Sequence, residues 1–174
     1  MNKNIIGVDI GGVIIGRIND KTDTSFFGNN YLSTPAIEGA FEQIALLRKS
    51  GFEIYLVSKC GIAVQEKSMD WLKHNRFFEI TGIAPENARF CKTRKEKAGI
   101  CESIGANYFI DDRLEVLSYL NKVDHLFLFN ADDKEVAKFS QHLRKVTRTD
   151  SWKEVSRSIL ATIEPLGLTK TLIV

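Results

Sequence analysis

The fold of this chain is decided by residues 5–13, Ile5-Ile6-Gly7-Val8-Asp9-Ile10-Gly11-Gly12-Val13. The apolar run before Asp9 has the composition of a strand that is buried on both faces of a parallel sheet. The first charged side chain after such a strand lies at the carboxyl edge of the sheet, where open α/β sheets bind ligands. The glycines that follow let the backbone turn sharply beside a ligand. Asp9 is therefore the leading candidate for a reactive residue. The competing interpretation is a carboxylate that only accepts hydrogen bonds from turn amides.

Length and composition predict one domain, residues 1–174, because 44% hydrophobic residues, including 11 Phe, suffice for a single core. A net charge of +2, from 24 basic and 22 acidic residues, gives no general attraction to nucleic acid or to anionic membranes. The odd number of cysteines, at Cys60, Cys91 and Cys101, favours free thiols in a reducing compartment. No apolar run has membrane-spanning length and the first residues lack a signal-peptide core, so we expect a cytoplasmic protein with no membrane partner.

Short apolar runs alternate with longer segments of helical period along the chain, a pattern typical of the α/β class. We therefore expect a three-layer, Rossmann-like parallel sheet with helices on both faces. The expected strands are residues 4–9, 53–58, 107–111 and 125–130, with a less regular one at 88–91. The expected helices lie between Pro35 and Gly51, from Gly61 through Leu72, and at residues 95–104, 133–143 and 152–163, the last capped by Asp150-Ser151.

Polar side chains end two further strands of the expected sheet. Ser58 ends the strand at 53–58, and the pair Asp111 and Asp112 ends the strand at 107–111. Because the carboxyl ends of parallel strands meet at one edge, we expect these groups to lie near Asp9. Carboxylates hold Mg²⁺ and a hydroxyl donates to phosphate oxygens, so the set predicts a site for a phosphoryl group. The alternative for Ser58 is a structural cap on the following helix.

A basic run, residues 92–97, precedes the helix that leads to the paired acids. Of its lysines, Lys97 is preferred as a phosphate ligand because the helical phase places it beside the apolar face, and Lys92 and Lys95 remain alternatives. The alternative for the run is a solvated helix start, which is the usual role of such charges. Arg113, directly after the acids, is expected to form a structural ion pair with one of them, and contact with the substrate is the alternative.

In this order, the motifs resemble those of the haloacid dehalogenase-like superfamily. Asp9 and Val13 match the first and last positions of its first motif, Asp-x-Asp-x-Thr/Val, and Gly11 stands where the second acid belongs. The second, third and fourth motifs are matched by Ser58, by Lys97, and by Asp111 with Asp112. The resemblance covers the chain from about residue 4 to about residue 130.

The resemblance implies a Mg²⁺-dependent hydrolase in which Asp9 attacks a phosphoryl group and forms an aspartyl-phosphate. Ser58 and Lys97 would then steady the phosphate oxygens. The metal ligands that it implies are Asp9, the carbonyl of Gly11, Asp112 and its neighbour Asp111.

Gly11 limits the activity that the resemblance implies. In the superfamily's phosphatases the missing acid protonates the leaving group and later activates water, a contribution on the order of 10²- to 10⁴-fold. We therefore expect a phosphoesterase with low turnover, unless Asp20 or Asp23 supplies the acid. The alternative is a catalytically impaired module of the same fold that binds a phosphate-bearing ligand or a protein.

Caps set substrate choice in this superfamily, and the segment from Val13 to Pro35 is too short for a substantial one. By resemblance, an open site takes a phosphorylated substrate that is small or macromolecular, nucleic acid not excluded, or is closed by a homo-oligomer partner. The run Ile110-Asp111-Asp112-Arg113 also resembles the superfamily's nucleotidases, which favours a nucleotide-like substrate. Phe26, Phe27 and Tyr31 would stack on a base, form such an interface, or pack within the segment itself.

Residues 6–12 also resemble the first phosphate motif of the sugar-kinase and actin-like superfamily. That fold needs two duplicated domains and a second glycine-rich phosphate motif, and this chain has neither the length nor the motif. The dehalogenase-like interpretation therefore has the stronger support.

Overall fold

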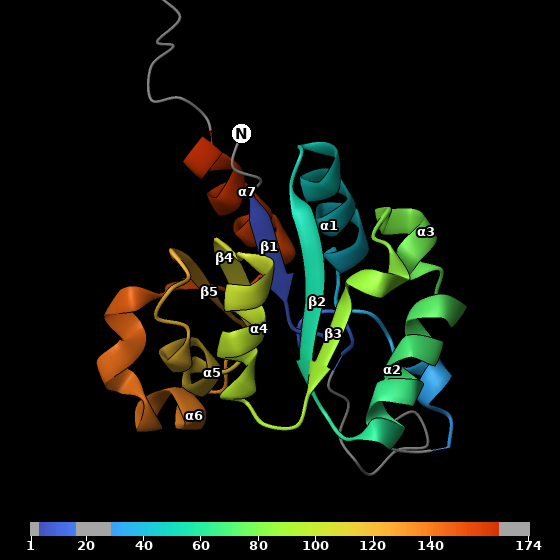
Figure 1. Cartoon of the computed structure of the whole chain (residues 1–174), viewed down its shortest axis with the longest axis horizontal. Coiled ribbons are helices and arrows are strands. Elements are labelled where there is room, and N and C mark those ends of the chain that lie inside the picture. Colours follow the sequence, from blue (N-terminus) through green and yellow to red (C-terminus); the bar gives the residue numbers. More distant parts are fainter. Residues whose placement is uncertain (1–3, 17–28, 164–174) are drawn as a thin grey trace, which may run out of the picture.

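The computed structural model describes residues 4–16 and 29–163. Its six strands form one parallel sheet in the order β3-β2-β1-β4-β5-β6 (Figure 1). This confirms the predicted α/β fold with a Rossmann-like parallel sheet. The strands are β1 (Ile5–Val8), β2 (Glu53–Lys59), β3 (Ala88–Cys91), β4 (Tyr108–Asp111), β5 (His125–Phe129) and β6 (Thr147–Thr149). The sequence pattern predicted the first five and missed the sixth, a three-residue strand at the edge of the sheet.

The helices are α1 (Ala40–Lys49), α2 (Ile62–His74), α3 (Phe77–Thr81), α4 (Glu96–Ile104), α5 (Leu114–Tyr119), α6 (Asp133–Lys138) and α7 (Trp152–Ile163). Short 3₁₀ helices occur at Tyr31–Ser33, Pro85–Asn87 and Ser140–Lys145. The helix predicted over residues 133–143 is too long, because Phe139 leaves the helical region at φ −122° and the chain continues as a 3₁₀ helix. The prediction that Ser151 caps α7 is confirmed, since its Oγ accepts a hydrogen bond from Glu154 N at 3.3 Å.

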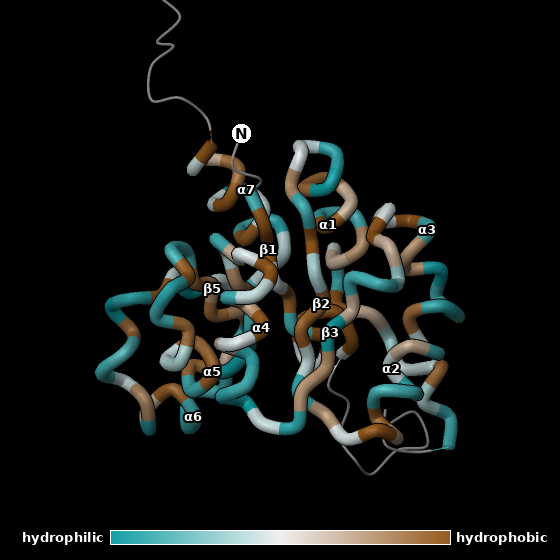
Figure 2. The backbone as a smooth tube through the Cα atoms, in the orientation of Figure 1, coloured by the Kyte–Doolittle hydropathy of each residue, from teal (hydrophilic) through white to brown (hydrophobic). Residues whose placement is uncertain are grey.

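Two apolar clusters cover the two faces of the sheet, as expected for three layers. On one face, side chains of β1, β2 and β4 pack against α1, α2, α3 and α7, with Trp71 and Trp152 fully buried. On the other face, side chains of β4 and β5 pack against α4, α5 and α6. Figure 2 shows hydrophobic residues along β1 and β2 and hydrophilic ones around the outer end of α6.

Gly7 allows β1 to pack closely against its neighbour β4. A Cβ at Gly7 would lie 2.5 Å from Cδ2 of Phe109, so no side chain fits there. Phe109 is fully buried in the cluster beneath α4 and α5. The glycine in the opening motif therefore contributes to packing as well as to the turn.

The turn after β1 is stabilised by its own hydrogen bonds and by α7, a helix far along the sequence. The carbonyl oxygen of Ile10 accepts hydrogen bonds from Ile14 N at 2.9 Å and Ile15 N at 3.0 Å, which closes the turn. Trp152 of α7 donates its Nε1–H to the carbonyl of Val13 at 2.8 Å, across a separation of 139 residues. The backbone directly after Asp9 is thus fixed by its own turn and by the buried core.

The three cysteines are free thiols, with Cys91 and Cys101 buried and Cys60 half-buried. Burial raises the pKa of Cys101 to about 12. Within residues 4–16 and 29–163, no helix is both long and apolar enough to cross a bilayer.

Candidate active site

The site lies where the order of the strands changes direction. The chain builds β1, β2 and β3 outward on one side and then returns to place β4 on the other side of β1. The carboxyl edge at such a switch point is where open α/β sheets bind ligands. Asp9 follows β1 directly, and its N–H donates to the carbonyl of Ile110 in β4 at 3.0 Å. This bond brings Asp9 beside the acids that end β4.

Lys97 joins the two strand ends. It stands in the first turn of α4 and is 2% exposed. Its Nζ lies 2.9 Å from Oδ1 of Asp9 and 2.7 Å from Oδ2 of Asp111, so one ammonium bridges both carboxylates. The choice of Lys97 over the other lysines agrees with this geometry, because Lys92 and Lys95 are exposed and pair with none of the described acids.

The charges of this buried cluster are coupled. Burial alone lowers the pKa of Lys97, but attraction to Asp111 and then to Asp9 outweighs it and raises the pKa well above the usual lysine value. Burial raises the pKa of Asp111 to about 6, with the ammonium of Lys97 opposing the rise. The ammonium of Lys97 thus forms a buried ion pair with Asp111 beside the further carboxylate of Asp9.

The three carboxylates can be tested as a metal site from their positions. Asp9, Asp111 and Asp112 are buried, and each offers an oxygen within 4.8 Å of those of the others. Oxygen donors with excess negative charge suit Mg²⁺. Both oxygens of Asp111 are already engaged, one by Lys97 and one by the backbone N–H of Arg113 at 2.9 Å. Asp111 is therefore the least available of the three as a metal ligand, and the donor set fits a divalent cation.

Ser58 lies at the same edge, in the strand that flanks β1 on the side opposite β4. Leu56 pairs with Val8, so Ser58 is two residues beyond the end of β1, and it is buried. The capping alternative is wrong, because α2 begins after Gly61 and has no side-chain cap. Gly11 faces open space: a Cβ there would have no neighbour within 4 Å, and its backbone needs no positive φ.

The loop before α4 is organised by Glu96. Its Oε2 accepts hydrogen bonds from Lys92 N at 2.9 Å and Thr93 N at 3.4 Å, which lowers the pKa of the Glu96 carboxyl. The side chain of Thr93 in turn accepts from Glu96 N at 3.4 Å. This reciprocal pair fixes the start of the helix that carries Lys97. Part of the basic run thus forms a helix start, which was the alternative interpretation.

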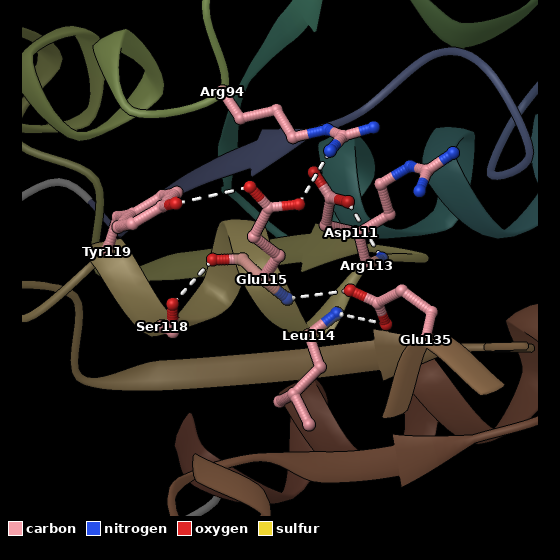
Figure 3. Close-up of polar contacts among 8 residues, drawn as sticks. All are labelled: Arg94, Asp111, Arg113, Leu114, Glu115, Ser118, Tyr119 and Glu135. Carbon is pink, nitrogen blue, oxygen red and sulfur yellow. Dashed lines mark hydrogen bonds and ion pairs between the residues drawn. The ribbon is translucent and has the colours of Figure 1, made fainter. Parts of the chain in front are cut away.

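The predicted ion pair of Arg113 with a neighbouring acid is wrong. Its guanidinium forms no ion pair or hydrogen bond with any described residue, whereas its backbone N–H binds Asp111. Arg94 instead forms an ion pair with Glu115, whose Oε2 lies 2.6 Å from its Nη1 (Figure 3). Glu135 of α6 accepts from Leu114 N at 3.0 Å and Glu115 N at 2.9 Å, which caps α5.

The helix α5 and its contacts were not predicted from the sequence. The apolar spacing of Leu114, Leu117 and Leu120 was a usable signal for a helix at residues 114–119, and all three are buried. The contacts of Glu115 and Glu135 carried no comparable signal.

The predicted aromatic group is only partly described. Phe26 and Phe27 lie outside the described residues, as do Asp20 and Asp23. Tyr31 donates its hydroxyl to Asp70 of α2 at 3.3 Å, and Nζ of Lys67 lies 5.1 Å from its ring centroid. For Tyr31 the structure favours packing within the protein.

Solved structures of similar fold include phosphatases, one complexed with magnesium and phosphate and one in a cobalt-bound form. The sequence itself matches no protein-family model and no curated protein. D,D-heptose 1,7-bisphosphate phosphatase from B. bronchiseptica, complexed with magnesium and phosphate, is 14% identical with a TM-score of 0.68, over 91% of this chain and 99% of that one. A haloacid dehalogenase-like family hydrolase from Streptococcus pneumoniae is 8% identical with a TM-score of 0.60, over 92% and 98%. A cobalt-bound deoxy-D-mannose-octulosonate 8-phosphate phosphatase from Haemophilus influenzae is 13% identical with a TM-score of 0.55, over 92% and 88%.

Proposed function

From the haloacid dehalogenase-like fold of this chain, we propose that it is a Mg²⁺-dependent phosphoesterase that uses Asp9 as its nucleophile. The observation that carries the proposal is the bridge made by Lys97 between Asp9 and Asp111, beside Asp112. A lysine this deeply buried beside three acids neutralises only part of their charge. The arrangement is poised for a divalent cation and a phosphate dianion together.

The proposed roles follow from the position of each group. Asp9 and Asp112 hold the metal with the carbonyl of Gly11, while Asp111 orients Lys97 rather than binding metal directly. When bound, the metal would neutralise charge on the phosphoryl oxygens. Lys97 and Ser58 bind the remaining phosphoryl oxygens.

The reaction divides into two displacements at phosphorus. An oxygen of Asp9 forms a bond to phosphorus as the bond to the leaving-group oxygen breaks, and that oxygen departs with the electron pair. Water then attacks the aspartyl-phosphate, which frees Asp9 and inorganic phosphate. With glycine at position 11, the leaving group takes its proton from solvent, so turnover is low.

The substrate is a phosphorylated compound, small or macromolecular. We propose a single domain without a substantial cap, so that the carboxyl edge stays open to such substrates. Two of the named neighbours are phosphatases, of a heptose 1,7-bisphosphate and of an octulosonate 8-phosphate, which favours phosphate monoesters as the class to test first.

The test is hydrolysis of p-nitrophenyl phosphate with and without Mg²⁺, in the wild type and in Asp9→Asn and Asp112→Asn. We expect Mg²⁺-dependent release of phosphate that both substitutions reduce to background. The matched control is Asp124→Asn, an exposed acid just before β5 at the opposite edge of the sheet, which should behave as wild type. Absence of turnover in the wild type would instead support the phosphate-binding module.

A further inference from the structure

An unpaired cation stands at the edge of the site. Arg113 follows Asp112 directly and is half-buried, yet its guanidinium contacts no described acid. Arginine at such a position ordinarily takes the nearest carboxylate, since the planar guanidinium matches its geometry. The guanidinium has no such partner in the described part of the chain, so it is available to bind an anion from outside the protein.

The backbone around Arg113 is held in place on three successive amides. Arg113 N donates to Asp111 Oδ1 at 2.9 Å, and the next two N–H groups both donate to Glu135. The root of the side chain is therefore fixed next to Asp112, the proposed metal ligand. Figure 3 shows the side chain extending away from Glu135, on the same side of the backbone as the carboxylate of Asp111.

The acids that surround Arg113 are already occupied. Glu115 pairs with Arg94 at 2.6 Å and accepts from the hydroxyl of Tyr119 at 3.1 Å. Glu135 uses one oxygen for each of two backbone amides. Asp111 is engaged by the buried lysine. The protein thus leaves the guanidinium charge uncompensated by these acids.

We propose that Arg113 binds a second anionic group, a phosphate or a carboxylate, on the leaving portion of the substrate. This rests on the proposed phosphoesterase function and narrows its substrate class to doubly anionic monoesters. In the proposed reaction, Lys97 is the cation that binds the transferred phosphoryl group. Its side chain is 2% exposed and lies in the interior of the site. Arg113 directly follows Asp112 in the chain but is only half-buried, so we place the far end of a short substrate beside its guanidinium.

The experiment compares three phosphate esters of one chain length: propyl phosphate, 3-phosphooxypropanoate and propane-1,3-diol bisphosphate. For the wild type, we expect kcat/KM for the two doubly anionic esters to exceed that for propyl phosphate by about 10- to 100-fold, the range for charge-assisted hydrogen bonds. Arg113→Gln should reduce this ratio to within about threefold of unity, and Arg113→Lys should retain part of it. The ester with the larger ratio identifies the second anion as phosphate or carboxylate.

The matched control is Arg157→Gln, which removes the same charge from an exposed position on α7 and should keep the wild-type ratio. A wild-type ratio near unity, or a ratio unchanged in Arg113→Gln, overturns the proposal while turnover that depends on Asp9 leaves the proposed function intact. Should no ester be hydrolysed, the phosphoesterase function fails. The affinity ratio for propylphosphonate and propane-1,3-bisphosphonate, measured by calorimetry with Mg²⁺, then still decides the role of Arg113.

Discussion

Replacing Gly11 by aspartate should raise the turnover rate of the proposed phosphoesterase. The site accepts the side chain, because a Cβ at Gly11 meets nothing within 4 Å and the backbone does not have a positive φ. The new carboxyl group stands two residues after Asp9 in the same turn. It can then protonate the leaving oxygen and later activate water.

The expected gain follows from general acid-base catalysis, which contributes on the order of 10²- to 10⁴-fold, or about 2.7–5.5 kcal/mol in the activation free energy. The gain should depend on the leaving group. Phenol has a pKa of about 10, near that of tyrosine, and needs a proton more than p-nitrophenolate does. We therefore expect Gly11→Asp to raise kcat/KM more for phenyl phosphate than for p-nitrophenyl phosphate.

The assay measures kcat and kcat/KM for both esters with saturating Mg²⁺ in the wild type, Gly11→Asp and Gly11→Asn. The asparagine variant matches the size of the new side chain but cannot exchange a proton. If Gly11→Asp is folded and binds Mg²⁺ yet is no faster than Gly11→Asn, the reasoning about the missing acid is refuted. A gain in kcat/KM, which reports the first displacement, that is equal for the two leaving groups would likewise contradict its role as a general acid.

Three further predictions concern the charges and the packing around the site. Lys97→Met should lower the free energy of unfolding, measured in urea, by about 3–5 kcal/mol, because it leaves buried acids without a cation. The double variant Lys97→Met with Asp111→Asn should be less destabilised than the single variant. Mg²⁺ at 100 times its dissociation constant should stabilise the wild type by about 2.7 kcal/mol and raise its Tm, and Asp112→Asn should lose that shift without a loss of stability in the metal-free state. Gly7→Ala should cost about 1–3 kcal/mol by overpacking against Phe109, and an unchanged Tm would show that the ring can move aside.

The parts of the site that the sequence predicted are those fixed by local periodicity. An apolar run that stops at a carboxylate places Asp9 and Asp111 at strand ends, and parallel strands bring these ends together. The helical phase placed Lys97 on the inner face of α4, where it lies between the two acids. For these residues, the element and its period are sufficient to give the direction of the side chain.

The parts that were missed depend on which charged groups meet in three dimensions. Arg113 was expected to take a nearby acid, but Arg94 reaches Glu115 from 21 residues away and Glu135 turns to the amides of α5. Which acids Arg94 and Lys97 meet is decided by the placement of α4 and the loop before it against β4 and α5. No spacing along the chain records that placement. The strand β6, with three residues, is likewise too short to show a period.

The bond from Trp152 to the carbonyl of Val13 has a consequence for biosynthesis. A ribosome releases the residues of the opening motif long before it reaches the tryptophan that completes their environment. Until then the nascent chain contains β1 and Asp9, but α7 has not yet packed against them. Competence for the reaction should therefore arise late in translation, and a nascent chain stalled before residue 152 should carry every proposed site residue and still lack activity.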